Sequence, residues 1–215
     1  MGEKLTLIGF GPSVYTWVVR WALAELKLYA AYVETNPFAA SPDTVLARYT
    51  RFDRVPVLQD GHFILTETAA ILRYINDVAQ AELVPKVPKA AARMAQVIGI
   101  ADADVYPILV RQVFSHGFYL QSIGQEGNEA ILKEGLRRAP PALQTLDQIA
   151  AEGLQLDGDM LSLADLHLGP MISYFARVPA GARMLRDYPA LARWWARLAR
   201  RPALQRTDPF AAEIS

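Results

Sequence analysis

One stretch of the sequence, from Arg54 to Ile71, combines residue types that could bind a small zwitterionic peptide. Its first part, Arg-Val-Pro-Val-Leu-Gln-Asp-Gly, opens an apolar run with Pro56 and ends in a turn signal at Asp60-Gly61. A second apolar run then leads into Thr-Glu-Thr, where a segment with helical spacing begins. A strand that passes into a helix at an acidic residue and a threonine can bind both a carboxylate and an amine.

Glu67 and Thr68 supply the polar groups of this candidate binding site. The free N–H groups and the positive end of the dipole at a helix N-terminus favour an anion. The Thr68 hydroxyl adds a donor, and the Glu67 carboxylate adds an acceptor for an ammonium group. The structural alternative is that Thr66 caps the helix while Glu67 offsets its dipole. The residues by themselves fit both interpretations.

Val55-Pro56 is the second informative feature. Proline cannot donate a hydrogen bond within a sheet, so a proline at the head of a strand beside a turn stands out. A cis bond there would turn the backbone of Val55 outward, where it could pair with a peptide ligand. The alternative is an ordinary trans proline at a strand edge, which is the commoner state of such bonds.

Ser13 follows the first apolar run at the start of a helical pattern, where its hydroxyl could donate to a thiolate. A free thiol has a pKa of about 8.5 and is mostly protonated at neutral pH. Lowering that pKa by roughly two units requires about 2.7 kcal/mol, and a hydrogen bond to a charged group supplies roughly 1.5–3 kcal/mol. The alternatives are a plain N-cap role for Ser13, or Tyr15 or Thr16 as the donor.

Composition excludes several other kinds of site. The 215 residues include no cysteine, which excludes disulfides, cysteine nucleophiles and zinc–thiolate sites. With three scattered histidines, a histidine metal site is not expected. We also expect no cofactor. The 22 Lys and Arg residues balance the 22 Asp and Glu residues, so no general attraction to nucleic acid or membrane is expected. A cytoplasmic location is the default expectation, because we find no signal peptide and no apolar span of roughly 20 residues.

Hydrophobic periodicity predicts an α/β front of the chain. A strand, a helix and a strand in succession suggest a parallel crossover unit. Asp60-Gly61 predicts a hairpin whose two central residues have positive φ. The predicted order is β-α-β-α-β-β-α, with strands over 4–10, 29–34, 55–59 and 62–65, helices over 14–28 and 67–78, and a short helix around 43–49.

The rest of the chain has only helical patterns. We therefore predict domains over 1–80 and 90–215, joined by a proline-containing linker over 81–89. Within the second domain, Ser162 and Asp165 form a capping-box pattern. The predicted helices span 90–121, 129–152 (with a kink or restart at Pro140-Pro141), 162–177 and 189–200.

These motifs, in this order, resemble the cytosolic glutathione transferase family, in a serine-type, bacterial-like form. The resemblance rests on the Arg54–Gly61 run followed by Thr-Glu-Thr-Ala-Ala-Ile, on the Ser162–Asp165 motif and on the Ser13-Val-Tyr-Thr-Trp-Val-Val-Arg segment. It covers nearly the whole chain. It implies a thioredoxin-like N-terminal domain followed by an all-α domain, and the lack of a cysteine in the first loop argues against thiol–disulfide chemistry.

The resemblance also implies a role for each candidate residue. Ser13 would stabilise the thiolate of glutathione, a co-substrate rather than a cofactor, and the thiolate would attack an electrophile. The Val55 backbone would pair with the cysteinyl part of glutathione, next to Pro56 as the cis proline. Glu67 and Thr68 would hold the γ-glutamyl end, and Arg54 could reach the glycyl carboxylate.

The second substrate would be a small apolar electrophile held by the helical domain. Family members are usually homodimers, so a homodimer is expected. Two other functions stay open: a non-catalytic module that docks to a partner protein, and a glutathione-dependent isomerase or peroxidase. The candidate electrophile contacts are Tyr15, Tyr106, Arg111 and Phe114.

Overall fold

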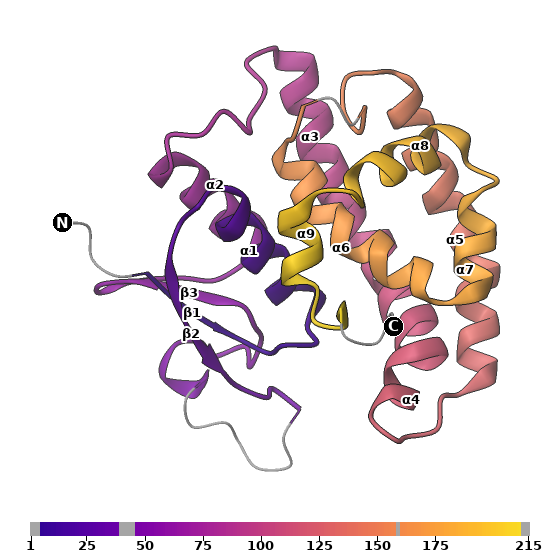
Figure 1. Cartoon of the computed structure of the whole chain (residues 1–215), viewed down its shortest axis with the longest axis horizontal. Helices are drawn as coiled ribbons and strands as arrows, with labels where there is room; N and C mark the ends of the chain where they lie inside the picture. Colours follow the sequence, from indigo (N-terminus) through magenta and orange to yellow (C-terminus); the bar gives the residue numbers. More distant parts are fainter. Residues whose placement is uncertain (1–4, 39–45, 158–159, 212–215) are drawn as a thin grey trace. The chain divides into compact units, whose positions relative to one another are not determined.

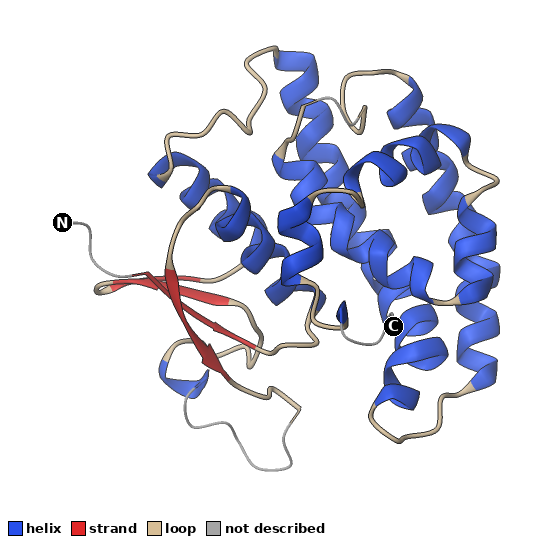
Figure 2. Cartoon of the chain, in the orientation of Figure 1, coloured by secondary structure: helices blue, strands red, loops and turns tan. Residues whose placement is uncertain are grey.

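The computed structural model describes residues 5–38, 46–157 and 160–211 (Figure 1). Its strands all lie in the first part of the chain, and helices make up most of the remainder (Figure 2). The elements are β1 (Leu5–Gly9), α1 (Val14–Glu25), β2 (Ala30–Glu34), η1 (Leu46–Arg48), β3 (Val57–Asp60), β4 (Phe63–Leu65), α2 (Thr68–Val78), α3 (Pro88–Ile100), η2 (Ala101–Tyr119), α4 (Leu120–Ser122), α5 (Glu129–Ala151), α6 (Leu163–Arg177), α7 (Pro179–Leu185), α8 (Pro189–Leu198) and α9 (Pro202–Thr207).

The strands form one sheet in the order β2-β1-β3-β4. β1 pairs in parallel with β2 across the α1 crossover, which confirms the predicted β-α-β unit, and β3 runs antiparallel to both β1 and β4. Gly9 lies opposite Glu34, and Ile8 lies opposite Val57. The end of β1, the end of β2 and the start of β3 therefore lie at the same edge of the sheet.

The hairpin between β3 and β4 turns one residue later than predicted. Asp60 pairs with Phe63, so the two turn residues are Gly61 and His62. Gly61 has a φ of 56°, whereas His62 is not among the residues of positive φ. A positive φ at the first turn residue alone is the requirement of a type II′ turn, which favours glycine there. The predicted positive φ is therefore confirmed at Gly61 and wrong at Asp60.

Of the short helix predicted around 43–49, residues 43–45 lie outside the described residues. The described part of that segment contains η1, a single 3₁₀ turn. Leu46 of this turn is buried and belongs to a small core cluster with Ile8 and Val57. The turn therefore covers the end of the sheet at which β3 begins.

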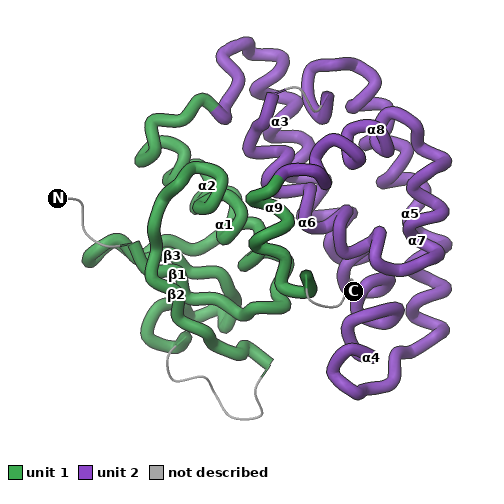
Figure 3. The backbone as a smooth tube through the Cα atoms, viewed as in Figure 1, with its two compact units in different colours: residues 1–82, 202–215 green, residues 83–201 purple. Residues whose placement is uncertain are grey.

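Contacts divide the chain into two units, residues 1–82 with 202–215, and residues 83–201 (Figure 3). In the first unit α1 packs against both α2 and α9. Trp17 is buried and its indole N–H donates to the Thr207 hydroxyl at 3.1 Å. This contact explains why the C-terminal segment, which the sequence analysis grouped with the helical domain, packs with the first unit.

A continuous helical segment runs from α3 through η2 to α4, over the span predicted as one helix. Its middle part, η2, is π-helical, so bonds join residues five positions apart. The Leu120 N–H donates to the Ser115 carbonyl, and the Ser115 hydroxyl donates to the Val110 carbonyl at 3.0 Å. Side chains along η2 consequently do not follow the spacing of an α-helix.

Helix α5 runs as one element through Pro140 and Pro141, so the alternative of a restart there is wrong. Proline removes a backbone donor from the helix, but buried side chains on both sides of the pair hold the segment in place. Ala139, Leu143 and Leu146 are buried, and α5 packs extensively against η2. The short helices α7 and α9 lie outside the predicted set, and each begins at a proline.

A buried polar cluster holds the start of α6. The Ser162 hydroxyl accepts from the Asp165 N–H at 3.4 Å, and the Asp165 carboxylate accepts from the Ser162 N–H at 2.7 Å, which confirms the capping box. The other carboxylate oxygen accepts from the Trp194 indole N–H at 2.6 Å. Burial raises the pKa of Asp165 above its ordinary value, against the opposing effect of these hydrogen bonds.

Replacing Asp165 by Ala should destabilise the fold strongly, because the Ser162 N–H and the Trp194 indole N–H both lose their buried acceptor. Each unsatisfied buried donor costs about 1–3 kcal/mol, so we expect the two to lower the free energy of unfolding by about 2–6 kcal/mol. Urea unfolding followed by circular dichroism measures it. Ser162→Ala, which mainly removes the capping hydroxyl, should cost about 1–2 kcal/mol. Equal losses in the two variants would contradict this account.

Candidate functional site

The strand register of the first unit gathers the predicted site residues at one edge of the sheet. β3 begins opposite the end of β1, and β4 ends near the start of β3 because Leu65 lies opposite Leu58. The segments that follow β1, precede β3 and follow β4 therefore meet there. These three segments carry Ser13, Arg54 with Val55 and Pro56, and Glu67 with Thr68.

The Val55–Pro56 peptide bond is cis, as the family resemblance implied. β3 begins at Val57, so Val55 lies before the first strand pair, and the described residues offer its backbone no hydrogen-bond partner. Pro56 is buried, whereas Val55 is half-buried with its side chain packed on the small core cluster below. The Val55 side chain thus anchors a backbone segment that an extended peptide can pair with.

Helix α2 begins one residue later than it would if Thr66 were its N-cap. Its N-cap is Glu67 rather than Thr66, and no side chain caps its first turn. Glu67 has φ 65° and ψ 115°, a conformation that costs a residue with a side chain about 1–3 kcal/mol. The Thr68 residue behind it is buried. The uncapped N–H groups of this first turn can bind an anion, with the Glu67 carboxylate beside them.

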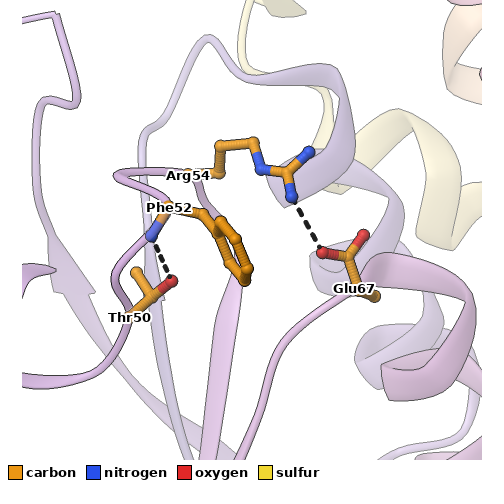
Figure 4. Close-up of polar contacts among 4 residues, drawn as sticks. All are labelled: Thr50, Phe52, Arg54 and Glu67. Carbon is orange, nitrogen blue, oxygen red and sulfur yellow. Dashed lines mark hydrogen bonds and ion pairs between the residues drawn. The ribbon is translucent and has the colours of Figure 1, made fainter.

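Arg54 lies next to Glu67 (Figure 4). The guanidinium bonds the carboxylate at 3.2 Å, and its central carbon lies 5.2 Å from the centroid of the Phe52 ring. The side chains of the ion pair are 65% and 64% exposed, so the pair contributes roughly 0–1 kcal/mol to stability. Its larger consequence is that a cation stands beside a carboxylate at the start of α2, where both remain accessible to a ligand.

Ser13 is the N-cap of α1, and its hydroxyl oxygen accepts from the Thr16 N–H at 3.4 Å. A hydroxyl has one proton to donate and two lone pairs, so capping leaves the proton available. No described residue accepts that proton. The N-cap role and the thiolate-binding role, treated as alternatives in the sequence, are therefore compatible at this position.

The other two hydroxyls near Ser13 differ in accessibility. Thr16 is completely buried, and its oxygen accepts from the Phe10 N–H at 3.2 Å. It also lies against the end of β1, since a Cβ on Gly9 would come within 2.4 Å of the Thr16 methyl group. Thr16 therefore cannot reach a bound thiol. Tyr15 is half-buried and remains the second hydroxyl in the first turn of α1.

The candidate electrophile contacts on η2 differ in their surroundings. Arg111 is exposed and Tyr106 is half-buried. Phe114 is 2% exposed, and its ring stacks on Tyr174 with centroids 3.9 Å apart. Phe114 is therefore a core residue of the second unit, which corrects its assignment as a pocket-lining side chain.

Sequence reasoning missed Glu34 and Phe52. The Glu34 carboxylate accepts from the Gly11 N–H at 2.9 Å, in the loop that carries Ser13. Parallel pairing of the first two strands could have located it, because residues at the ends of such strands share an edge. Phe52 lies under Arg54 without any local pattern to identify it.

The described residues contain no cluster of three or more histidine or acidic side chains that could hold a metal ion. Over the same residues, none of the helices has the length and apolarity that crossing a bilayer requires.

Comparison with known proteins agrees with this geometry. Residues 3–77 match the N-terminal domain model of glutathione S-transferase, and residues 80–202 match the C-terminal domain model. Glutathione S-transferase 1 of Zea mays is 29% identical over 156 residues, 72% of each chain. A glutathione S-transferase I structure bound with lactoylglutathione is 26% identical with a TM-score of 0.82, over 98% of this chain and 99% of that one.

A second structure, glutathione S-transferase I from maize in complex with an atrazine glutathione conjugate, is 25% identical with a TM-score of 0.78. The match covers 99% of this chain and 100% of that chain. The N-terminal domain model matches ahead of the C-terminal one, and together the two models cover most of the chain. The chain belongs to the cytosolic glutathione S-transferase family.

Proposed function

We propose that the protein is a glutathione transferase of the serine type, in which Ser13 stabilises the thiolate of bound glutathione. The observation that carries the proposal is the position of the Ser13 hydroxyl. It caps α1 with a lone pair while its proton has no acceptor among the described residues. Relatives of this chain have been solved with lactoylglutathione and with an atrazine glutathione conjugate, which supports a thiol adduct as the product.

Glutathione binds along the sheet edge as an extended peptide. The Val55 backbone pairs with its cysteinyl part beside the cis Pro56. Its γ-glutamyl carboxylate binds the uncapped first turn of α2 at Thr68, and its ammonium group binds the Glu67 carboxylate. Arg54, already oriented by its bond to Glu67, attracts the glycyl carboxylate.

Thiolate formation then requires only a modest energy. A pKa lowered by two units corresponds to about 2.7 kcal/mol. A charge-assisted hydrogen bond from the Ser13 hydroxyl contributes roughly 1.5–3 kcal/mol, and the dipole of α1 adds about 0.3–1 kcal/mol. The thiolate attacks an electrophilic carbon of an apolar second substrate, so the protein acts by lowering a pKa and by holding two reactants together.

The second substrate contacts Tyr106 and Arg111 on η2, with Phe114 supporting them from the core of the second unit. The working form is a homodimer in the cytoplasm, with no cofactor, in keeping with the family expectation. Conjugation by a serine-type member is thus the specific activity that we assign to this chain.

Calorimetric titration with reduced glutathione, repeated with S-methyl glutathione, tests the proposal. Binding of both ligands, with proton release for the free thiol alone, is expected if the site forms a thiolate. Conjugation of an electrophile panel would then identify the second substrate, and turnover of peroxides or cis-alkene acids alone would favour a peroxidase or isomerase. A well-folded protein that binds neither ligand would contradict the proposal and favour a non-catalytic interaction module.

Ser13→Ala should lower kcat/KM by about a hundredfold, the factor that corresponds to 2.7 kcal/mol. Glutathione affinity should change little, because the hydroxyl contacts the sulfur rather than the ends of the peptide. The rise of kcat/KM with pH should move to higher pH, since the bound thiol regains a pKa nearer its ordinary value. Stopped-flow absorbance of the thiolate measures that shift. Ser13→Thr keeps a hydroxyl and should recover part of the activity, whereas wild-type turnover in Ser13→Ala would transfer the role to Tyr15.

Glu67→Gly and Glu67→Ala should separate binding from backbone strain. Both variants lose the carboxylate and should bind glutathione more weakly in calorimetry. Glycine accepts a φ of 65° without a side-chain penalty, so its variant should have a free energy of unfolding about 1 kcal/mol higher than the alanine variant. Equal stability of the two variants would show that the backbone at Glu67 is unstrained, and undiminished affinity would remove the carboxylate from the site.

A further inference from the structure

The loop between β1 and α1 presents Ser13, and local hydrogen bonds fix most of its backbone. The Phe10 N–H donates to the Thr16 hydroxyl at 3.2 Å. The Ser13 N–H donates to the Phe10 carbonyl at 2.9 Å, and Pro12 has no N–H to donate. These contacts shape the turn, but they join it only to its own neighbours in sequence.

The one N–H of the loop that reaches a distant residue is that of Gly11, which donates to the Glu34 carboxylate at 2.9 Å. Glu34 is the last residue of β2 and lies 23 positions further along the chain. A Cβ on Gly11 would lie 3.7 and 3.8 Å from the two carboxylate oxygens, so the backbone passes close to them. A bond from an N–H to an ionised carboxylate is shorter and stronger than one between neutral groups.

The neighbouring Tyr32 orients this carboxylate, and Arg20 in turn lies against the Tyr32 ring. The Tyr32 hydroxyl, on the same strand, donates to its second oxygen at 2.5 Å. Partial burial and this hydrogen bond raise the pKa of Tyr32, so the phenol keeps its proton and remains a donor at neutral pH. The Arg20 guanidinium of α1 lies 5.5 Å from the centroid of the Tyr32 ring. The group that holds Gly11 is therefore bonded by Tyr32 of the same strand, and α1 contacts the ring of that tyrosine.

We propose that Glu34 is a positioning residue, whose carboxylate holds the Gly11 amide and so fixes the loop that presents the Ser13 hydroxyl to the thiol. The inference deepens the proposed transferase function and rests on it. It assigns Glu34 no contact with glutathione.

The exposure of the pair favours positioning over a contribution to folding. Glu34 is exposed and Tyr32 is 41% exposed, and such contacts add little to the free energy of folding. Catalysis depends far more steeply on geometry, since a displacement of about 1 Å can cost roughly a hundredfold in rate. Loss of the Glu34 contact should therefore affect turnover much more than stability.

Kinetics and thermal unfolding of Glu34→Ala, Glu34→Gln and Tyr32→Phe test the proposal in the full chain. Glu34→Ala should lower kcat/KM by about tenfold or more and move its pH profile to higher pH, with a melting temperature near that of the wild type. Glu34→Gln keeps an acceptor for the Gly11 N–H and should recover most of the loss, while Tyr32→Phe should give an intermediate loss. Asp77→Ala, which removes another exposed carboxylate of the same unit, should behave as the wild type.

A wild-type rate and pH profile in Glu34→Ala would overturn the proposal. So would equal losses in Glu34→Gln and Glu34→Ala, because charge rather than the acceptor contact would then be responsible. Amide hydrogen exchange gives an independent measurement that needs no glutathione. The Gly11 and Ser13 amides should exchange faster in Glu34→Ala than in the wild type, and unchanged exchange would overturn the proposal. If the wild type forms no thiolate, only the transferase function fails, and the exchange result still decides the role of Glu34 in fixing the loop.

Discussion

The parallel pairing of β1 with β2 is the constraint on which the candidate site depends. It places Glu34 opposite Gly9, so the ends of both strands lie together and the loop after β1 passes beside the end of β2. A slip of one residue would send the Glu34 side chain to the opposite face of the sheet. The start of α1 restricts the loop a second time, because Thr16 lies so close to Gly9 that a Cβ on Gly9 would clash with it. Ser13 is therefore presented by a loop held from two directions.

Most of the fold follows from local patterns, and the exceptions have specific causes. Alternation and helical spacing located β1, α1 and the β3–β4 hairpin, but the turn residues depend on which pair of strand residues closes the hairpin, and that is a matter of register. Proline has the lowest helix propensity, yet α5 continues through Pro140 and Pro141 because it packs against η2. The π-helical winding of η2 is also absent from the hydrophobic pattern, so periodicity could not show that Phe114 points into the core.

Some residues of the candidate site could likewise be identified from sequence motifs, and others could not. Ser13, the Val55-Pro56 pair and Glu67 were identifiable because each belongs to a short motif at the boundary of an element. The family resemblance added the cis state of the proline, for which the dipeptide alone favours trans. Glu34 acts through a partner 23 residues away, and neither residue carries a local signal. Sequence motifs thus identified the residues that we propose as ligand contacts, but they did not identify the residue that we propose to position one of them.

The two helix N-termini at this edge are built differently, and the difference matches the two kinds of negative charge in the proposed ligand. The first turn of α1 is capped by Ser13, so the group offered there is a single hydroxyl proton, suited to one sulfur atom. The first turn of α2 has no side-chain cap, so it offers several N–H groups, which suit a carboxylate with two oxygens. A side-chain cap on α2 would occupy one of those N–H groups. The open first turn of α2 thus accompanies an unfavourable backbone conformation at Glu67, whereas Ser13, which caps α1, has an ordinary extended one.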